Sequence, residues 1–171
     1  MFIENAAEFI RDACYSLAID SISYKKLYDA EYHVQEIFDS PELIANLDRN
    51  AVAVDRSVYD YIVYDSAVQS RFSIDLDDDP DVKMFFKLPS RFKVDTPIGS
   101  YNPDWAVYVE IDGMKQLYFV LETKGSTNKQ TDLRGRERLK IHCGREHFKA
   151  IDSGVQLHAA TRWKEFKVRN T

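Results

Sequence analysis

The chain has 171 residues, of which 44% are hydrophobic and 30% are charged, and its formal net charge is −5. These totals are typical of a soluble globular protein with a core of ordinary size. No apolar run approaches the ~20 residues of a membrane span, so we expect a cytoplasmic protein with no membrane partner. The two cysteines lie far apart without metal-binding spacing, which predicts reduced thiols rather than a disulfide or a zinc site.

The first 50 residues have helical character. Apolar side chains recur at three- and four-residue steps from Phe2 to Leu17, which predicts an amphipathic helix. Further helical segments are predicted over residues 24–38 and 42–47, and nothing in the region indicates chemistry. We therefore expect a helical connector or extension over residues 1–50 and one folded domain over residues 51–171.

The next part of the chain predicts alternating strands and helices. A short strand or a packed approach to the next helix is expected over residues 57–64, a helix over 67–76 with Asp65 or Ser66 as its cap, and a core strand over 82–88. After a hairpin over residues 101–125, the pattern predicts a helix over 132–150 and a strand over 155–160. The final aromatic and cationic residues, around Trp163, are expected either to pack or to touch DNA.

The hairpin carries the residues on which the functional interpretation depends. In a strand, side chains two apart share a face, so Glu122 and Lys124 should point the same way. A three-residue loop over 112–114 would pair Ile111 with Lys115 and bring Asp104 opposite Glu122 on that face, whereas a two-residue loop over 113–114 would put Asp104 opposite Thr123. We favour the first register, in which two carboxylates and an ammonium converge at the end of a strand.

Pro103-Asp104 followed by Glu122-x-Lys124 resembles the PD-(D/E)xK nuclease motif, a weak pattern alone. A wider set of segments is similar to the C-terminal endonuclease domain of the restriction (Res) subunit of type III restriction-modification enzymes. The segments, which together are specific, are Lys87-Leu88-Pro89, Phe92-Lys93-Val94-Asp95-Thr96-Pro97-Ile98-Gly99, Tyr101 to Ala106, Leu117 to Gly125, and Leu133 to Phe148. The resemblance implies an α/β fold with a restriction-endonuclease-like PD-(D/E)xK core, in which helices flank a mixed central sheet.

The resemblance also implies a Mg²⁺-dependent DNA endonuclease, with Mn²⁺ as a possible substitute. Asp104 and Glu122 would hold the ion, with help from the backbone carbonyl of Thr123. The ion would polarise the phosphoryl oxygen and lower the pKa of the attacking water, while Lys124 would orient that water and stabilise the developing charge. The family further implies double-stranded DNA, an ATP-driven translocase region and a methyltransferase or specificity subunit as partners, and this chain has no P-loop motif of its own.

One position departs from the family pattern. An acidic residue is implied three positions before Phe72, and Gln69 stands there. A neutral amide oxygen could orient a metal-bound water but would hold a cation less strongly than Glu. Three alternatives follow. The site could work with two carboxylates and a weaker third group at Gln69, or this copy of the site could have low or no activity. Gln69 could also be only a surface residue of a helix.

The charges are distributed unevenly along the chain. Residues 1–113 contain 10 basic and 22 acidic side chains, whereas residues 114–171 contain 13 and 6. We interpret the basic half, which begins near the suspected catalytic strand, as the part that meets DNA phosphates. The expected phosphate contacts are Lys129, Arg134, Arg138 and Lys140, although Lys140 could instead pair with a neighbouring glutamate.

Two alternatives stay open. The chain could be a catalytically weak or inactive DNA-binding or docking module, in which case Gln69 is the symptom. It could also be a repair or resolvase-type nuclease on the same fold, which a preference for nicked, branched or plain duplex DNA would distinguish.

Overall fold

The computed structural model describes residues 2–20, 23–25, 50–122 and 135–170, in places the backbone only. Helix α1 (Phe2–Asp20) confirms the predicted N-terminal helix. The helices predicted over 24–38 and 42–47 lie almost entirely outside the described residues. In the described part of the chain, no helix combines the length and the apolar character that crossing a bilayer requires.

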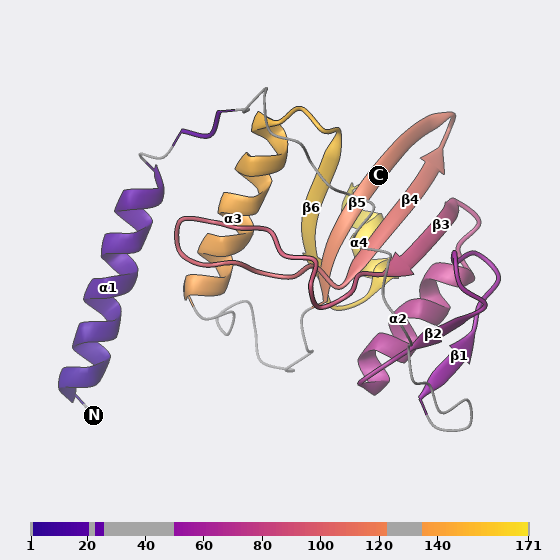
Figure 1. The fold of residues 1–171 in the computed structure, drawn as a ribbon, viewed down its shortest axis with the longest axis horizontal. Coiled ribbons are helices and arrows are strands. Elements are labelled where there is room, and N and C mark those ends of the chain that lie inside the picture. Colours follow the sequence, from indigo (N-terminus) through magenta and orange to yellow (C-terminus); the bar gives the residue numbers. More distant parts are fainter. Residues whose placement is uncertain (1, 21–22, 26–49, 123–134, 171) are drawn as a thin grey trace.

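A four-stranded sheet with the order β3-β4-β5-β6 forms the centre of the molecule (Figure 1). Its strands are β3 (Val82–Lys87), β4 (Trp105–Ile111), β5 (Met114–Glu122) and β6 (Val155–Ala160). The pairs β3–β4 and β4–β5 are antiparallel, whereas β6 runs parallel to β5 after a crossover that contains α3 (Gly135–Ala150). The sheet is therefore mixed, as the resemblance implied.

β2 (Tyr61–Val63) confirms a short strand within residues 57–64, and it forms a short hairpin with β1 (Ala51–Ala53), which was not predicted. The N–H of Val54 donates to the carbonyl of Asp60 at 3.1 Å and closes the intervening loop. Of the aromatic and β-branched residues of this segment, Val58 and Tyr59 lie in that loop, so the strand is confined to Tyr61–Val63. Strands of three residues are too short to show an alternating pattern.

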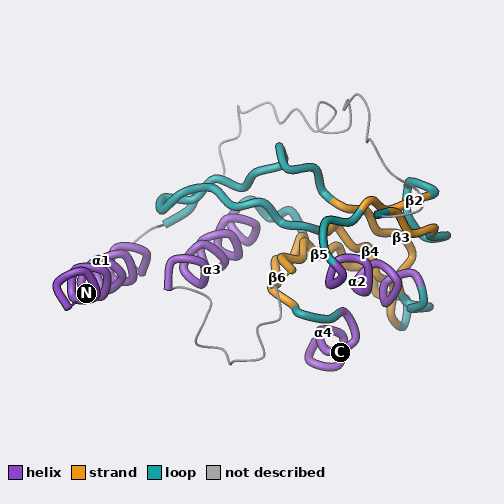
Figure 2. Tube along the Cα trace, turned by 90° about the horizontal axis from the view of Figure 1, so that it is seen from below, coloured by secondary structure: helices purple, strands orange, loops and turns teal. Residues whose placement is uncertain are grey.

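Helices cover both faces of the sheet. α2 (Ala67–Asp77) and α4 (Trp163–Asn170) contact each other, and Figure 2 shows them together on one side of the strands. Alternation in β5 sorts the core, because Val120 packs into the cluster shared with α2 and α4 whereas Phe119 packs against the cluster of α3. The first cluster is centred on Phe72, Phe85, Trp105, Val107, Val120, Trp163 and Phe166, and the second on Val94, Ile141, Phe148 and Leu157. The final aromatic residues around Trp163, which were expected to pack or to touch DNA, thus belong to helix α4, and Trp163 and Phe166 pack into the first cluster.

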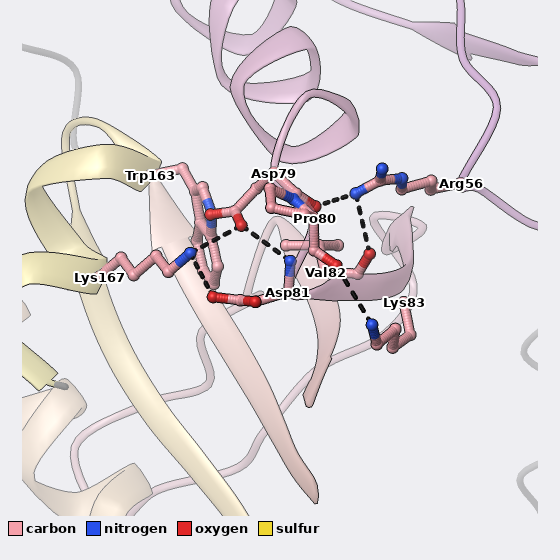
Figure 3. Close-up of polar contacts among 8 residues, drawn as sticks. All are labelled: Arg56, Asp79, Pro80, Asp81, Val82, Lys83, Trp163 and Lys167. Atoms are coloured by element: carbon pink, nitrogen blue, oxygen red, sulfur yellow. Dashed lines mark hydrogen bonds and ion pairs between the residues drawn. The ribbon is translucent and has the colours of Figure 1, made fainter. Parts of the chain in front are cut away.

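A carboxylate at the end of α2 joins this helix to α4 (Figure 3). Asp79 is 9% exposed, and its Oδ2 accepts from the indole N–H of Trp163 at 2.8 Å. Its Oδ1 accepts from Lys167 Nζ at 2.7 Å and from the backbone N–H of Asp81 at 3.0 Å. Burial alone raises the pKa of the Asp79 carboxyl, but the hydrogen bonds from Lys167, Asp81 and Trp163 outweigh it and hold that pKa below its ordinary value.

The segment that leads into β4 packs closely on α3. Tyr101 lies against Gly144, where a Cβ would overlap the tyrosine hydroxyl and come within 2.6 Å of Leu157 Cδ2. Only a glycine leaves room for this approach. The contact fixes the distance between α3 and the segment that carries Asp104 three residues later.

Replacing Asp79 with Ala should lower the free energy of unfolding by about 2–3 kcal/mol, because Trp163 and Lys167 lose their acceptor. The folded-state pKa of Asp79 lies below the unfolded value, so its contribution is present above the unfolded pKa and is lost as pH falls through the folded pKa. Urea unfolding at neutral and acidic pH should therefore show that the difference in free energy of unfolding between wild type and Asp79→Ala becomes smaller in acid. The neighbouring exposed Asp78→Ala is the control, and equal midpoints for the two variants would contradict the role of Asp79.

Replacing Gly144 with Ala should destabilise the protein although alanine is the better helix former. The propensity gain is at most about 1 kcal/mol, whereas overpacking typically costs about 1–3 kcal/mol. Thermal unfolding should show a lower Tm for Gly144→Ala and partial recovery in the double variant Tyr101→Phe/Gly144→Ala, which lacks the colliding oxygen. A higher Tm for Gly144→Ala would show that the approach of Tyr101 is not tight.

Candidate active site

A braced loop delivers Asp104 to the sheet. The amide nitrogen of Asn102 donates to the carbonyls of Phe92 at 2.6 Å, Pro103 at 3.0 Å and Pro89 at 3.2 Å. The backbones of Val94 and Tyr101 exchange two hydrogen bonds of 2.8 and 3.0 Å. One side-chain amide therefore holds three backbone carbonyls together, which gives the loop before β4 a defined shape.

The turn within this loop explains part of the sequence pattern. Thr96 Oγ1 donates to the carbonyl of Gly99 at 2.5 Å, and the N–H of Gly99 returns a bond of 3.0 Å to the carbonyl of Thr96. Gly99 has a φ of 113°, which residues with a Cβ rarely adopt. The Thr-Pro-Ile-Gly segment is thus a turn that reverses the chain between Val94 and Tyr101.

Asp104 lies immediately before β4, half-buried between two strands. Its carbonyl accepts from the N–H of Leu88 at 2.8 Å, whereas its N–H donates to the carbonyl of Val120 at 2.9 Å. In a regular antiparallel pair, both groups of one residue bond to the same neighbour. Asp104 divides them between the β3 side and the β5 side, so the regular ladder of β4 ends at this residue and its alternation does not fix the direction of the Asp104 side chain.

The predicted hairpin register is wrong. Ile111 pairs with Met114 and not with Lys115, because the loop is the two residues Asp112 and Gly113. Both have positive φ, 51° and 80°, as in the type I′ turn that matches the right-handed twist of the strands. Counted along this register, the position opposite Asp104 is Leu121, neither of the two positions expected.

The backbones of the two suspected metal ligands still come to one end of the sheet. Asp104 bonds to Val120, two residues before Glu122, which is the last residue of β5 and pairs with Ala160 at the end of β6. β3 also ends here, since Lys87 pairs with Trp105. Four chain segments thus begin or end together. Thr123, Lys124, Lys129 and Arg134 lie outside the described residues, as do the side chains of Glu122 and Arg138.

Gln69 takes part in the cap of α2. Ser66 is the N-cap, and its Oγ accepts from the N–H of Gln69 at 3.2 Å. The Gln69 Oε1 accepts from the N–H of Asp65 at 3.0 Å. This reciprocal pattern is close to a capping box, whose sequence signal, Ser-x-x-Gln before an apolar run, is present at Ser66 but was not used above.

Lys87 is a charged residue at this end of the sheet to which the sequence analysis assigned no role. Its Nζ donates to Asp65 Oδ2 at 2.7 Å and to the carbonyl of Val63 at 3.1 Å. Two contacts from the segment before α2 therefore hold the ammonium one strand away from the start of β4. The only sequence signal was its place in Lys-Leu-Pro.

Lys140, a predicted DNA contact, donates from Nζ to the carbonyl of Ser100 at 2.9 Å and so supports the loop before Asp104. Of the two glutamates that are alternative partners, Glu146 forms no ion pair with Lys140 among the described residues, and the side chain of Glu137 lies outside them. The contact of Lys140 with DNA stays a prediction. His158, two residues before the end of β6, has its pKa lowered by burial and by the charge of Arg145, and its ring packs on Tyr118 and Phe166. We assign it to the core.

An open cavity of about 520 Å³ lies elsewhere, against α3 and the first residues of β6. Gln116 and Val155 line it, which places it at the opposite end of β5 and β6 from Glu122. Within the described residues, no three His, Cys, Asp or Glu side chains are grouped closely enough to hold a metal ion. Two of the predicted ligands lie outside that description, the side chain of Glu122 and all of Thr123, so the candidate site rests on Asp104 and on the converging backbones.

Two comparisons with known proteins bear on this arrangement. Residues 55–164 match the model of a family described as "Endonuclease domain", a range that contains Asp104, Glu122 and Lys124. The chain is also 26% identical over 152 residues to the Res subunit of the type III restriction-modification enzyme EcoPI of Escherichia phage P1. The alignment covers 87% of this chain and 15% of that subunit, and no solved structure matches. The family model matches more than half of the chain, and the matched part contains the mixed sheet flanked by helices. The chain therefore belongs to the endonuclease domain family.

Proposed function

We propose that this chain is a Mg²⁺-dependent DNA endonuclease domain that hydrolyses phosphodiester bonds, and that it is the DNA-cleavage module of a type III restriction enzyme. The observation that carries the proposal is the braced loop that brings Asp104 to the sheet end where β5 finishes at Glu122. The similarity to a Res subunit supports the type III assignment.

The oxygen donors at this end suit a hard divalent cation. Carboxylates of Asp104 and Glu122 and the carbonyl of Thr123 are the ligand types that Mg²⁺ prefers, and Mn²⁺ accepts the same set. When bound, such an ion polarises a phosphoryl oxygen. The role of Lys124 is to orient the attacking water and to stabilise negative charge that develops on the phosphate.

The remaining partners follow from the size of the relative. The chain spans 15% of the length of the EcoPI Res subunit and carries no P-loop motif. We therefore propose that an ATP-driven translocase region lies in the same parent subunit, and that a methyltransferase or specificity subunit selects the site. Double-stranded DNA is the substrate, with Lys129, Arg134, Arg138 and Lys140 as sequence-independent phosphate contacts.

One observation favours the alternative of a weak or inactive DNA-binding module. Where the family pattern has an acid, Gln69 is neutral, and its amide oxygen already accepts the N–H of Asp65. We assign Gln69 a structural role in the cap, and its role as a helper of the metal site stays a prediction. The isolated domain should accordingly nick DNA weakly and more efficiently with Mn²⁺ than with Mg²⁺.

Supercoiled plasmid incubated with Mg²⁺ or Mn²⁺ should be nicked by the wild-type domain. Asp104→Ala and Lys124→Ala should each slow nicking by about 10²–10³-fold, the range seen when a group that stabilises a transition state is removed. Glu110→Ala is the matched control, because it removes an acid near the far end of β4, the strand that Asp104 immediately precedes. Gel quantification of the nicked form gives the rates.

Three results are possible in this assay. Nicking that persists in Asp104→Ala would reject the assignment of the site. A wild-type domain that shifts DNA on a gel but never nicks it would support the binding module. Faster cleavage of branched than of plain duplex DNA would favour a resolvase-type nuclease.

Variants of Gln69 should separate its two possible roles. Gln69→Ala should lower the free energy of unfolding by about 0.5–1 kcal/mol through loss of the cap, whereas Gln69→Glu should preserve it, since a carboxylate can accept the same N–H near a helix N-terminus. Chemical denaturation measures both. A tenfold or greater gain in nicking by Gln69→Glu at unchanged stability would instead show that the position serves the metal site and that glutamine weakens it.

A further inference from the structure

Lys87 ends β3 beside the start of β4. It pairs with Trp105, and the next residue, Leu88, donates its N–H to the carbonyl of Asp104 at 2.8 Å. Paired residues of neighbouring strands lie about 5 Å apart at Cα, and their side chains share a face of the sheet. Lys87 therefore shares a face of the sheet with Trp105, the residue after Asp104, and the hydrogen bond from Leu88 places the backbone of Lys87 beside the residue that would hold the substrate.

Two oxygen atoms fix the ammonium of Lys87. Asp65 Oδ2 lies at 2.7 Å and the carbonyl of Val63 at 3.1 Å, and the Lys87 side chain is 24% exposed against 78% for Asp65. A lysine ammonium has three donors, so these contacts leave one for a ligand. An ammonium that is held in place and partly desolvated binds a phosphate oxygen at a lower entropic cost than a lysine on a free surface.

We propose that Lys87 binds a DNA phosphate at the candidate active site and that Asp65 is its positioning residue. The proposal rests on the proposed function of the sheet end formed by Asp104 and Glu122. It adds a cation from residues 1–113, the acidic half of the chain, which contains only 10 basic side chains. The competing explanation is that Lys87 merely neutralises Asp65, as surface ion pairs commonly do.

The chain offers a matched control on the same strand. Lys83 is exposed near the opposite end of β3, where its Nζ donates to the carbonyl of Pro80 at 3.2 Å. Lys83→Met and Lys87→Met thus remove the same charge from one strand at its two ends. Any difference in DNA binding between them reports position and not net charge.

The first experiment measures binding of the full chain to a short labelled duplex by fluorescence anisotropy, in EDTA and over a range of salt concentrations. Lys87→Met should weaken binding at every sequence tested and reduce the slope of log Kd against log salt by about one, the loss of one phosphate contact. Lys83→Met should leave the slope unchanged. Equal slopes for the two variants would overturn the proposal.

The double variant Asp65→Asn/Lys87→Met separates phosphate binding from charge neutralisation. It has the net charge of the wild type and leaves neither side chain as an unpaired ion, so it also serves if Lys87→Met alone does not fold. We expect its salt slope to stay reduced by about one. Recovery of the wild-type slope and affinity would show that Lys87 only neutralises Asp65, and the proposal would fail.

The single variant Asp65→Asn tests positioning. Lys87 keeps its charge, so the salt slope should match that of the wild type, while kcat for nicking with Mn²⁺ should fall about tenfold and KM should change little, because the ammonium is no longer held against the reacting phosphate. Unchanged kcat would remove the positioning role. Parallel loss of slope and kcat would show a structural effect.

The outcomes distinguish this proposal from the proposed function. If nicking depends on Asp104 but Lys87→Met behaves like Lys83→Met, only the role of Lys87 is rejected. If the wild type binds DNA without nicking and the slope still falls with Lys87→Met, phosphate binding holds although the nuclease assignment fails. No measurable binding of DNA by the wild type would reject both.

Discussion

The hydrogen bonds of Asp79 fix the layer of helices on which the candidate site depends. One carboxylate receives donors from Trp163 and Lys167 of α4 and from the backbone of Asp81, which leads into β3. Arg56 adds a contact from its guanidinium to the carbonyls of Asp79 and Val82. Because a buried carboxylate without partners is costly, α4 and the start of β3 are held in one arrangement relative to α2.

The candidate site is built at the other end of these same elements. α2 begins at the Ser66 cap, which the Gln69 and Asp65 contacts complete, and β3 ends at Lys87, which reaches back to Asp65. The Asn102 amide then braces the loop that returns the chain to β4 at Asp104. Hydrogen bonds of polar side chains, most of them to backbone groups, therefore do much of the positioning. Such a construction tolerates a polar, hydrated site, since few of its contacts need a dry core.

Sequence patterns predicted the elements better than their register. The strand over residues 155–160, the helix capped by Ser66 and the hairpin that contains Asp104 and Glu122 are all confirmed as elements, because their signals are local. The register was missed because the sequence is compatible with two loops, a two-residue turn at Asp112 and Gly113 and a three-residue loop one position longer. The structure has the two-residue turn, whose geometry matches the twist of the strands. The split bonding of Asp104 depends on two neighbouring strands at once, which no local pattern contains. Likewise, the contact between Asp79 and Trp163 joins residues 84 positions apart.

Within the described residues, part of the charge asymmetry of the sequence is offset by pairing between its two halves. Several acids of the first half have structural partners, some of them cations from the second half. Asp75 pairs with Lys164 at 3.2 Å and Asp79 with Lys167 at 2.7 Å. Asp77 instead accepts backbone N–H groups of residues 55 and 56 at 2.8–3.1 Å.

The balance of charge in each half of the chain therefore gives little guide to the field that DNA would meet. Two cations of α4, Lys164 and Lys167, pair with acids on the α2 side of the sheet. Salt at physiological concentration screens charges over about 8 Å, so a phosphate responds mainly to the few charges nearest to it. An acidic protein can bind a polyanion on this basis when individual cations are held at the right positions, and the position of each cation matters more than the sum of all of them.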